Sequence, residues 1–132
     1  MKKLVLVILL IYGGMIDPTY SQTLQQSTTR IFVSFAFETI TISTSAIGFT
    51  SATLAPTSNT ALRAELAEYS LEGCQVRYKI TNNGVTNPTS TVGTLLTTGA
   101  GKIYGYDNIS TIKFIRDTSC SADATLSVHY YR

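Results

Sequence analysis

The sequence predicts an all-β protein, namely a single β-sandwich of jelly-roll or Ig-like type with about eight strands. Apolar and polar residues alternate with period two in most segments after residue 30. Gly, Pro and Asn separate these segments, and strands spaced about eight to twelve residues apart are typical of sandwiches. We expect a signal peptide over residues 1–21, a flexible leader over 22–30 and one sandwich domain over 31–132.

The first 21 residues have the pattern of an export signal. Two lysines precede an apolar run from Leu4 to Tyr12, and the small residues Thr19 and Ser21 suit the −3 and −1 positions of a cleavage site. This predicts a mature chain that begins at Gln22. The apolar run is shorter than the about 20 residues of a transmembrane helix, so cleavage is favoured over retention as a short membrane anchor. We expect a secreted protein, extracellular or at the cell surface, without a stable membrane span.

An additional N-terminal strand is predicted over residues 31–39. Its apolar face is expected to carry four residues: Ile31, Val33, Phe35 and Phe37. Ile40 and Ile42 continue the alternation with the opposite parity. Because a one-residue slip exchanges the two faces of a strand, a break or bulge is expected near Glu38 and Thr39.

The remaining strands follow in order along the chain. Residues 59–72 are rich in helix formers, yet Leu62, Ala64 and Leu66 alternate with polar neighbours, and a strand is favoured. Gly99 to Gly101 is predicted to be a tight turn. Further strands are expected over residues 74–81, 92–96, 102–106, 109–116 and 126–131.

Cys74 and Cys120 are the only cysteines. An exported chain meets an oxidising environment, so a disulfide is the simplest interpretation of the pair. The alternative is two free thiols, buried or bound to metal, but the chain has no CxxC spacing and a single His.

The chain shows no pattern of an active site, so an enzyme is not predicted and no cofactor is expected. His129 is the only imidazole, whereas a catalytic triad also needs a positioned nucleophile and an acid. With a net charge of +2, nucleic acid is not an expected partner. The acidic residues beyond the signal are expected to be solvated at strand edges and turns: Glu38, Glu65, Glu68, Glu72, Asp107, Asp117 and Asp123.

Two motifs approach ligand-binding patterns without completing them. Asp117 to Asp123 has oxygen-bearing side chains at alternate positions, as in a calcium loop, but lacks the central Gly and the distal Glu. Gly99 to Lys102 resembles a fragment of a phosphate loop, and a glycine turn between strands explains it better. No metal site is predicted.

A glycan is a candidate partner. Tyr104 and Tyr106 are expected on one face of a strand, and Tyr131 is expected beside His129 on one face of the last strand. Exposed tyrosines can stack on sugars, although packing at the core or its rim is their commoner role. Asn108-Ile109-Ser110 is a glycosylation triplet with Asn108 as the acceptor.

Six segments resemble a loose group of small β-sandwich proteins found among tailed-phage virion genes and environmental sequences. In chain order from Gly48 the segments read GFTSATLAP, RYKI, TVGTLL, GYDNI, FIR and DATLSVHYY. The resemblance implies consecutive strands of one compact sandwich, with residues 59–72 as a strand, and a structural role. The export signal, the strand over 31–39 and the cysteine pair are departures from that group.

The resulting hypothesis is a secreted structural subunit that self-assembles into an extracellular filament or pilus-like fibre. The strand over 31–39 could be donated to a neighbouring copy, with its four apolar residues as anchors. Alternatively it folds back into its own sandwich. The rival functions are a phage virion protein, as a decoration or fibre subunit, and a secreted carbohydrate-binding module.

Overall fold

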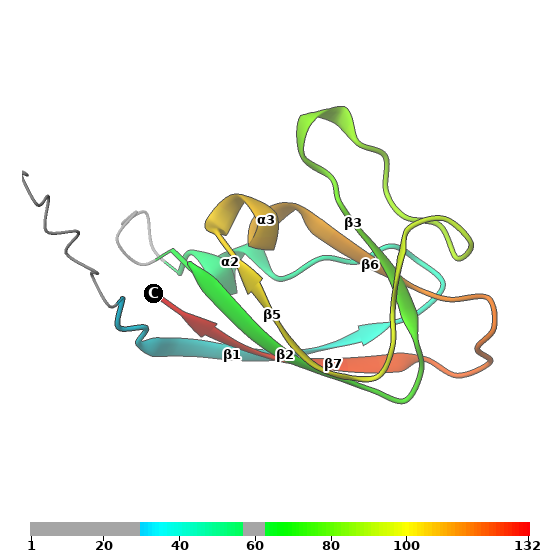
Figure 1. The fold of residues 1–132 in the computed structure, drawn as a ribbon, viewed down its shortest axis with the longest axis horizontal. Helices are drawn as coiled ribbons and strands as arrows, with labels where there is room; N and C mark the ends of the chain where they lie inside the picture. Colours follow the sequence, from blue (N-terminus) through cyan, green and yellow to red (C-terminus); the bar gives the residue numbers. More distant parts are fainter. Residues whose placement is uncertain (1–29, 57–62) are drawn as a thin grey trace, which may run out of the picture. The chain divides into compact units, whose positions relative to one another are not determined.

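The computed structural model describes residues 30–56 and 63–132, and the compact unit begins at Ile31. The expected signal peptide, and the expected leader up to residue 29, lie outside the described residues. The described elements are the strands β1 (Ser34–Ile42), β2 (Leu66–Glu72), β3 (Val76–Ile80), β4 (Thr94–Leu96), β5 (Gly99–Tyr104), β6 (Ile112–Arg116) and β7 (Ala124–Tyr131), with the short helices α2 (Ser51–Leu54), η2 (Asn82–Gly84) and α3 (Tyr106–Thr111). The strands form two antiparallel sheets (Figure 1).

The strand order is that of a jelly roll. Sheet A has the order β1-β7-β2-β5, and sheet B has the order β4-β3-β6. Residues 43–47 lie along the free edge of β6, where Ile47 and Phe114 exchange backbone hydrogen bonds of 2.8 and 2.7 Å. Counting this segment as the second strand, the first strand pairs with the eighth, the second with the seventh, the third with the sixth and the fourth with the fifth. The predicted sandwich is confirmed, in its jelly-roll form.

β1 pairs with β7 of the same chain, so the strand folds back into its own sandwich in this structure (Figure 1). The register runs from Ser34 opposite Tyr131 to Ile42 opposite Ala124. The backbone groups of Val33 and Arg132 extend the pairing with hydrogen bonds of 2.9 and 3.1 Å. The strand therefore begins later than the predicted range of 31–39 and continues through Ile42.

The predicted faces of this strand are wrong. The irregularity of register lies between Ser34 and Ala36 and not near Glu38. From Ala36 onward the even-numbered residues face the core, so Ile40 and Ile42 are buried whereas Phe37 is exposed. The earlier bulge brings the whole later part of β1 into one alternation, with Glu38 on the inner side.

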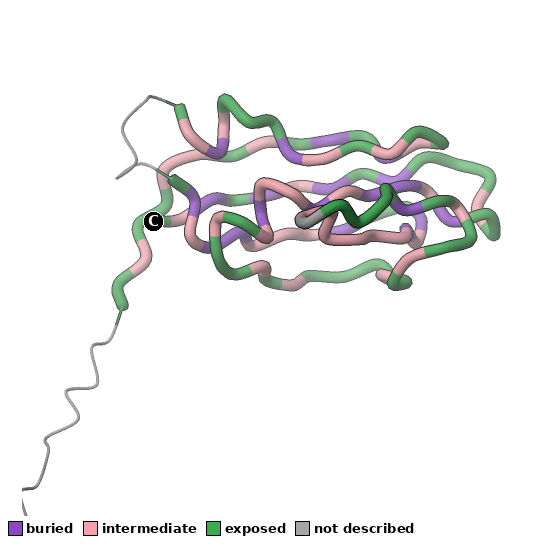
Figure 2. The backbone as a smooth tube through the Cα atoms, turned by 90° about the horizontal axis from the view of Figure 1, so that it is seen from above, coloured by how far each residue is buried: buried purple, intermediate pink, exposed green. Residues whose placement is uncertain are grey.

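The core lies between the two sheets. Phe49 packs between them, with its ring centre 5.4 Å from that of Phe114 in β6 and 5.6 Å from that of Tyr130 in β7. Buried residues alternate with more exposed ones along the strands (Figure 2), as expected for sheets with one face in the core. The largest fully buried side chains are Tyr130, Phe114, Ile42, Leu54, Leu71, Ile109, Leu126, Val76 and Val128.

The predicted strands over 74–81, 92–96 and 126–131 are confirmed by β3, β4 and β7, and the described part of 59–72 contains β2. The predicted turn at Gly99–Gly101 is wrong, since these residues begin β5 opposite Leu71, Ser70 and Tyr69. A Cβ at Gly101 would overlap the ring and hydroxyl of Tyr69, so the glycine makes room for that side chain. β5 ends at Tyr104, and residues 106–111 form α3 before β6 begins.

Candidate functional site

The four predicted assembly residues lie just before β1 and in its first half, and β1 is one of the two edge strands of sheet A. Ile31 exposes 82% of its surface, Val33 54% and Phe37 53%. Phe35 is half-buried against the core, with the Arg132 guanidinium 5.8 Å from its ring centre. Within the described residues, β1 has a strand partner on one edge only. Exposed apolar residues therefore accompany an unpaired sheet edge, which is a template for pairing with another strand.

Glu38 links β1 to the interior of the domain. The buried Tyr130 hydroxyl donates a hydrogen bond to the Glu38 carboxylate, and the Thr50 backbone N–H donates to the same carboxylate at 3.1 Å. Burial, and then the bond to Glu38, raise the pKa of Tyr130. Glu38 is thus half-buried and hydrogen-bonded inward, contrary to the prediction of a solvated carboxylate. Its shared parity with Ile40 and Ile42 was the available signal in the sequence.

A row of four side chains crosses the outer face of sheet A in register: Phe37, His129, Glu68 and Lys102. The rings of Phe37 and His129 lie 4.7 Å apart. The Lys102 ammonium lies 2.6 Å from one Glu68 oxygen, and the Tyr131 hydroxyl donates to the other at 2.9 Å. The bond to Lys102, and to a smaller extent the bond to Tyr131, lower the pKa of Glu68. Glu68 in turn raises the pKa of Lys102 and that of Tyr131. The sequence did not reveal this cluster, because its members come from four separate strands.

An open groove of about 440 Å³ lies beside this row, over β7, β2 and β5. Its lining includes the small residues Ser70, Ala100 and Ser127 and the polar side chains of Glu68 and Lys102. Such a surface can exchange hydrogen bonds with a hydroxyl-rich molecule.

Two of the three tyrosines predicted to contact sugar lie on this outer face. Tyr104 and Tyr131 pair with Leu66 from opposite sides. Tyr104 is 58% exposed on the edge strand β5. Tyr106 belongs to α3, is half-buried and lies beneath the Arg63 guanidinium at 4.9 Å. The prediction that Tyr104 and Tyr106 share a strand face is therefore wrong.

Asn108, the predicted glycosylation acceptor, lies in α3. Its side-chain Nδ2 donates a hydrogen bond to the Tyr104 carbonyl at 3.0 Å. A glycan would attach to this same nitrogen and would leave it one hydrogen, so the sugar would have to be accommodated beside the Tyr104 carbonyl.

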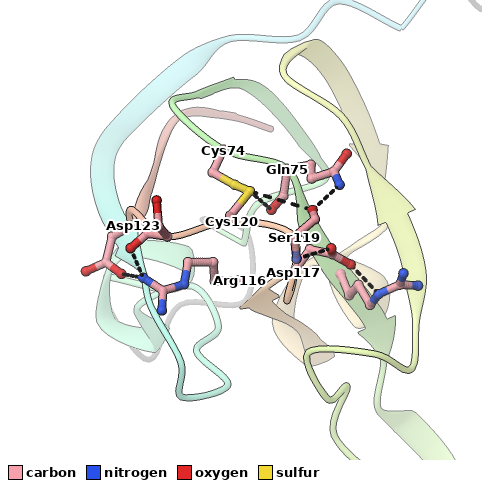
Figure 3. Close-up of a disulfide and its surroundings, with 9 residues drawn as sticks. Cys74, Gln75, Arg116, Asp117, Ser119, Cys120 and Asp123 are labelled. Carbon is pink, nitrogen blue, oxygen red and sulfur yellow. Dashed lines mark hydrogen bonds and ion pairs between the residues drawn. A yellow bond between two sulfur atoms is a disulfide. The ribbon is translucent and has the colours of Figure 1, made fainter.

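The predicted disulfide is confirmed: Cys74, next to β3, is joined to Cys120 in the loop after β6 (Figure 3). The two Cα atoms are 6.2 Å apart, which is within the usual range. The Gln75 amide donates to the Ser119 hydroxyl at 2.6 Å, and the Ser119 backbone N–H donates to Asp117 at 2.9 Å. The bridge and these bonds together fix the loop that follows β6.

Asp117 is the only buried charged residue in the described part of the chain, at 4% exposure, so the prediction that it is solvated is wrong. The Arg77 Nε lies 2.5 Å from its carboxylate. The N–H and hydroxyl of Ser119, and then Arg77, lower the pKa of Asp117 against the effect of desolvation. Asp123, at the other end of the calcium-like motif, pairs with Arg116 at 2.8 Å. Each carboxylate thus faces its own arginine, and nowhere among the described residues do three His, Cys, Asp or Glu side chains gather around one point.

A second cavity, of about 310 Å³, opens between the sheets on the side of β4 and β5. Its lining is mainly apolar and aromatic, and includes Tyr69, Tyr78, Leu96, Ile103 and Tyr104. We refer to it as the recess.

Comparison of the chain with models of protein families, with curated proteins and with solved structures finds no match. Among the described residues, none of the helices has the length and apolar character needed to cross a membrane.

Proposed function

We propose that this protein is an exported structural subunit that self-assembles outside the cytoplasm through the edge of β1. The observation that carries the proposal is that the outer edge of the nine-residue strand β1 has no strand partner among the described residues, and that the apolar side chains of Ile31, Val33 and Phe37 are exposed there. Monomeric proteins usually protect such edges with lysine, proline or bulges. The only charged residue of β1, Glu38, points inward, and the bulge lies at the very start of the strand.

Edge addition accounts for this geometry better than donation of the whole strand. β1 is already paired with β7 from Ser34 to Ile42, and Glu38 ties it to Tyr130. Donation would break all of these bonds before new ones form. Addition to the free edge keeps them and gains a second set of backbone hydrogen bonds. The apolar signal-like run and the disulfide support export.

The test is the assembly state of the full chain, expressed for export and purified as the host releases it. We expect filaments by electron microscopy and a concentration-dependent rise in mass on a sizing column. Val33→Asp should abolish assembly, because it places a charge beside the β1 edge. Val85→Asp is the matched control, since Val85 is exposed to a similar extent (46% against 54%) but lies in the loop after η2. A wild-type chain that stays monomeric at high concentration would overturn the proposal.

A second candidate is glycan binding on the outer face of sheet A, favoured by the groove and by the exposed Tyr104 of β5, the strand that also supplies Lys102 to the groove. A glycan array would test it. Hits that Tyr104→Ala and Lys102→Ala both remove would support this function, whereas an array without hits would exclude the sugars it displays.

A further inference from the structure

The exposed large apolar side chains of the described residues gather on two opposite flanks of the sandwich. The first, the β1 flank, consists of β1 and residues 31–33 and 43–47. The second, the β5 flank, consists of β4 and β5 and the residues just before β4. Ile31, Val33, Phe37 and Ile47 lie on the β1 flank, and Val92, Leu95 and Tyr104 lie on the β5 flank, which leaves only Val85 outside both.

Both edge strands of sheet A lack a second strand partner within the described residues. Every neighbouring pair in the sheet is antiparallel. β1 and β5, with two strands between them, therefore run in opposite directions. If β5 of one copy pairs with β1 of the next, the antiparallel alternation continues and every copy keeps the same orientation. Such a contact joins different surfaces and does not close on itself, so it generates an open filament.

We infer that the partner of the β1 flank is the β5 flank of a second copy, so that sheet A continues from subunit to subunit. This inference rests on the proposed self-assembly and names the surface that receives β1. In a register that continues the existing rows, Phe37 lies beside Lys102 of the preceding copy and Thr39 beside Ala100. Val33 and Ile31 then lie beyond Tyr104, at the end of β5.

Charge and shape agree with this pairing. β1 has no charged side chain on its outer side, and the only charged residue of β5, Lys102, is already paired with Glu68. No like charges meet along the joint. The recess opens on the β5 flank, between Leu96 of β4 and Ile103 and Tyr104 of β5. It offers a mainly apolar space for side chains of the incoming β1 flank, with Lys102 and Asn108 as the polar residues of its lining.

The alternative geometry is a two-fold contact between two β1 edges, which closes as a dimer. Two blocked variants of the full exported chain distinguish the two geometries. Val33→Asp with Phe37→Asp blocks β1, and Ala100→Asp with Tyr104→Asp blocks β5. All four positions are exposed, so both variants should keep the thermal unfolding midpoint of the wild type, which is measured first.

We expect wild-type filaments, two monomeric variants and, on mixing the variants in equal amounts, a complex of twice the monomer mass that does not grow. The intact β5 of one variant can bind the intact β1 of the other, and no further site remains. If the wild type assembles but the β5-blocked variant still forms dimers or filaments, the inference is overturned while the proposed function stands. A monomeric wild type overturns the proposed function itself.

Discussion

The disulfide between Cys74 and Cys120 should supply a large share of the stability of the domain. The bridge spans a sequence separation of 46 residues, and closing a loop of that size lowers the entropy of the unfolded chain by an amount worth about 4 kcal/mol. The folded state should change little on reduction, because the Gln75–Ser119 bond and the Asp117–Arg77 pair still hold the loop. For a domain of roughly 100 residues, such a loss lowers Tm by roughly 20 °C.

The assay is urea unfolding of the oxidised chain, the reduced chain and the Cys74→Ser, Cys120→Ser double variant. We expect the free energy of unfolding of the reduced chain and of the double serine variant to be about 4 kcal/mol lower than that of the oxidised chain. Both should also show a larger m-value, because their unfolded chains are more expanded. Cys74 is buried at 7% exposure, so the serine variant should lose slightly more than the reduced chain. A loss below about 1 kcal/mol with an unchanged m-value would refute the attribution to chain entropy.

Three further changes test the core, β5 and the loop after β6. Tyr130→Phe removes the donor to Glu38 and should cost about 2 kcal/mol in urea unfolding, but clearly less in a Glu38→Gln background. Gly101→Ala should cost about 1 to 3 kcal/mol by displacing the Tyr69 ring, whereas Ala100→Ser should be neutral by the same measurement. The pKa of Asp117 is lowered in the fold from its ordinary value of 3.8, so its stabilising contribution is complete above about pH 4 and is lost as the pH falls through the folded-state pKa. Asp117→Asn should therefore flatten the acid limb of a plot of Tm against pH; an unchanged slope would contradict this.

The sequence predicted most accurately those strands that have one apolar and one polar face. In β3 and β7, Val76, Leu126 and Val128 alternate with polar residues, and the structure buries these three residues. The disulfide could be predicted equally well, since the sequence contains only two cysteines and one pairing. Local alternation is sufficient here because the side chain itself reveals which face meets the core.

The failures share a different cause, namely contacts between residues far apart in the chain. The faces of β1 were misassigned because its outer side carries Phe37, while its inner side carries Glu38, whose charge is satisfied by Tyr130, 92 residues away. Gly101 reads as a turn residue, yet it lies within a strand because Tyr69 occupies the space of its missing side chain. The choice between jelly-roll and Ig-like order depends on which strands pair, and a local pattern does not contain that information.

Part of the candidate site could likewise be predicted from the sequence, and part could not. The sequence predicted an apolar run at Ile31, Val33, Phe35 and Phe37, but it placed Phe37 on the same face as Phe35, whereas the structure exposes Phe37 and half-buries Phe35. The cluster of Glu68, Lys102 and Tyr131 and the opposed flanks were not, because they exist only once β7, β2 and β5 lie side by side. A charged residue alternating with serine in one strand gives no hint of its partners in the next.

The pairing of β1 with β7 also determines when the sandwich can close. β1 has no strand to pair with until residues 124–131 have emerged, so its apolar side chains stay unprotected through most of synthesis. Long-range closure of this kind is slow compared with local hairpin formation. During that interval β1 can pair with β7 of a second molecule in the same register that it forms with β7 of its own chain. Folding is thus a kinetic competition between closure within one chain and exchange between two, and refolding yields should depend on protein concentration.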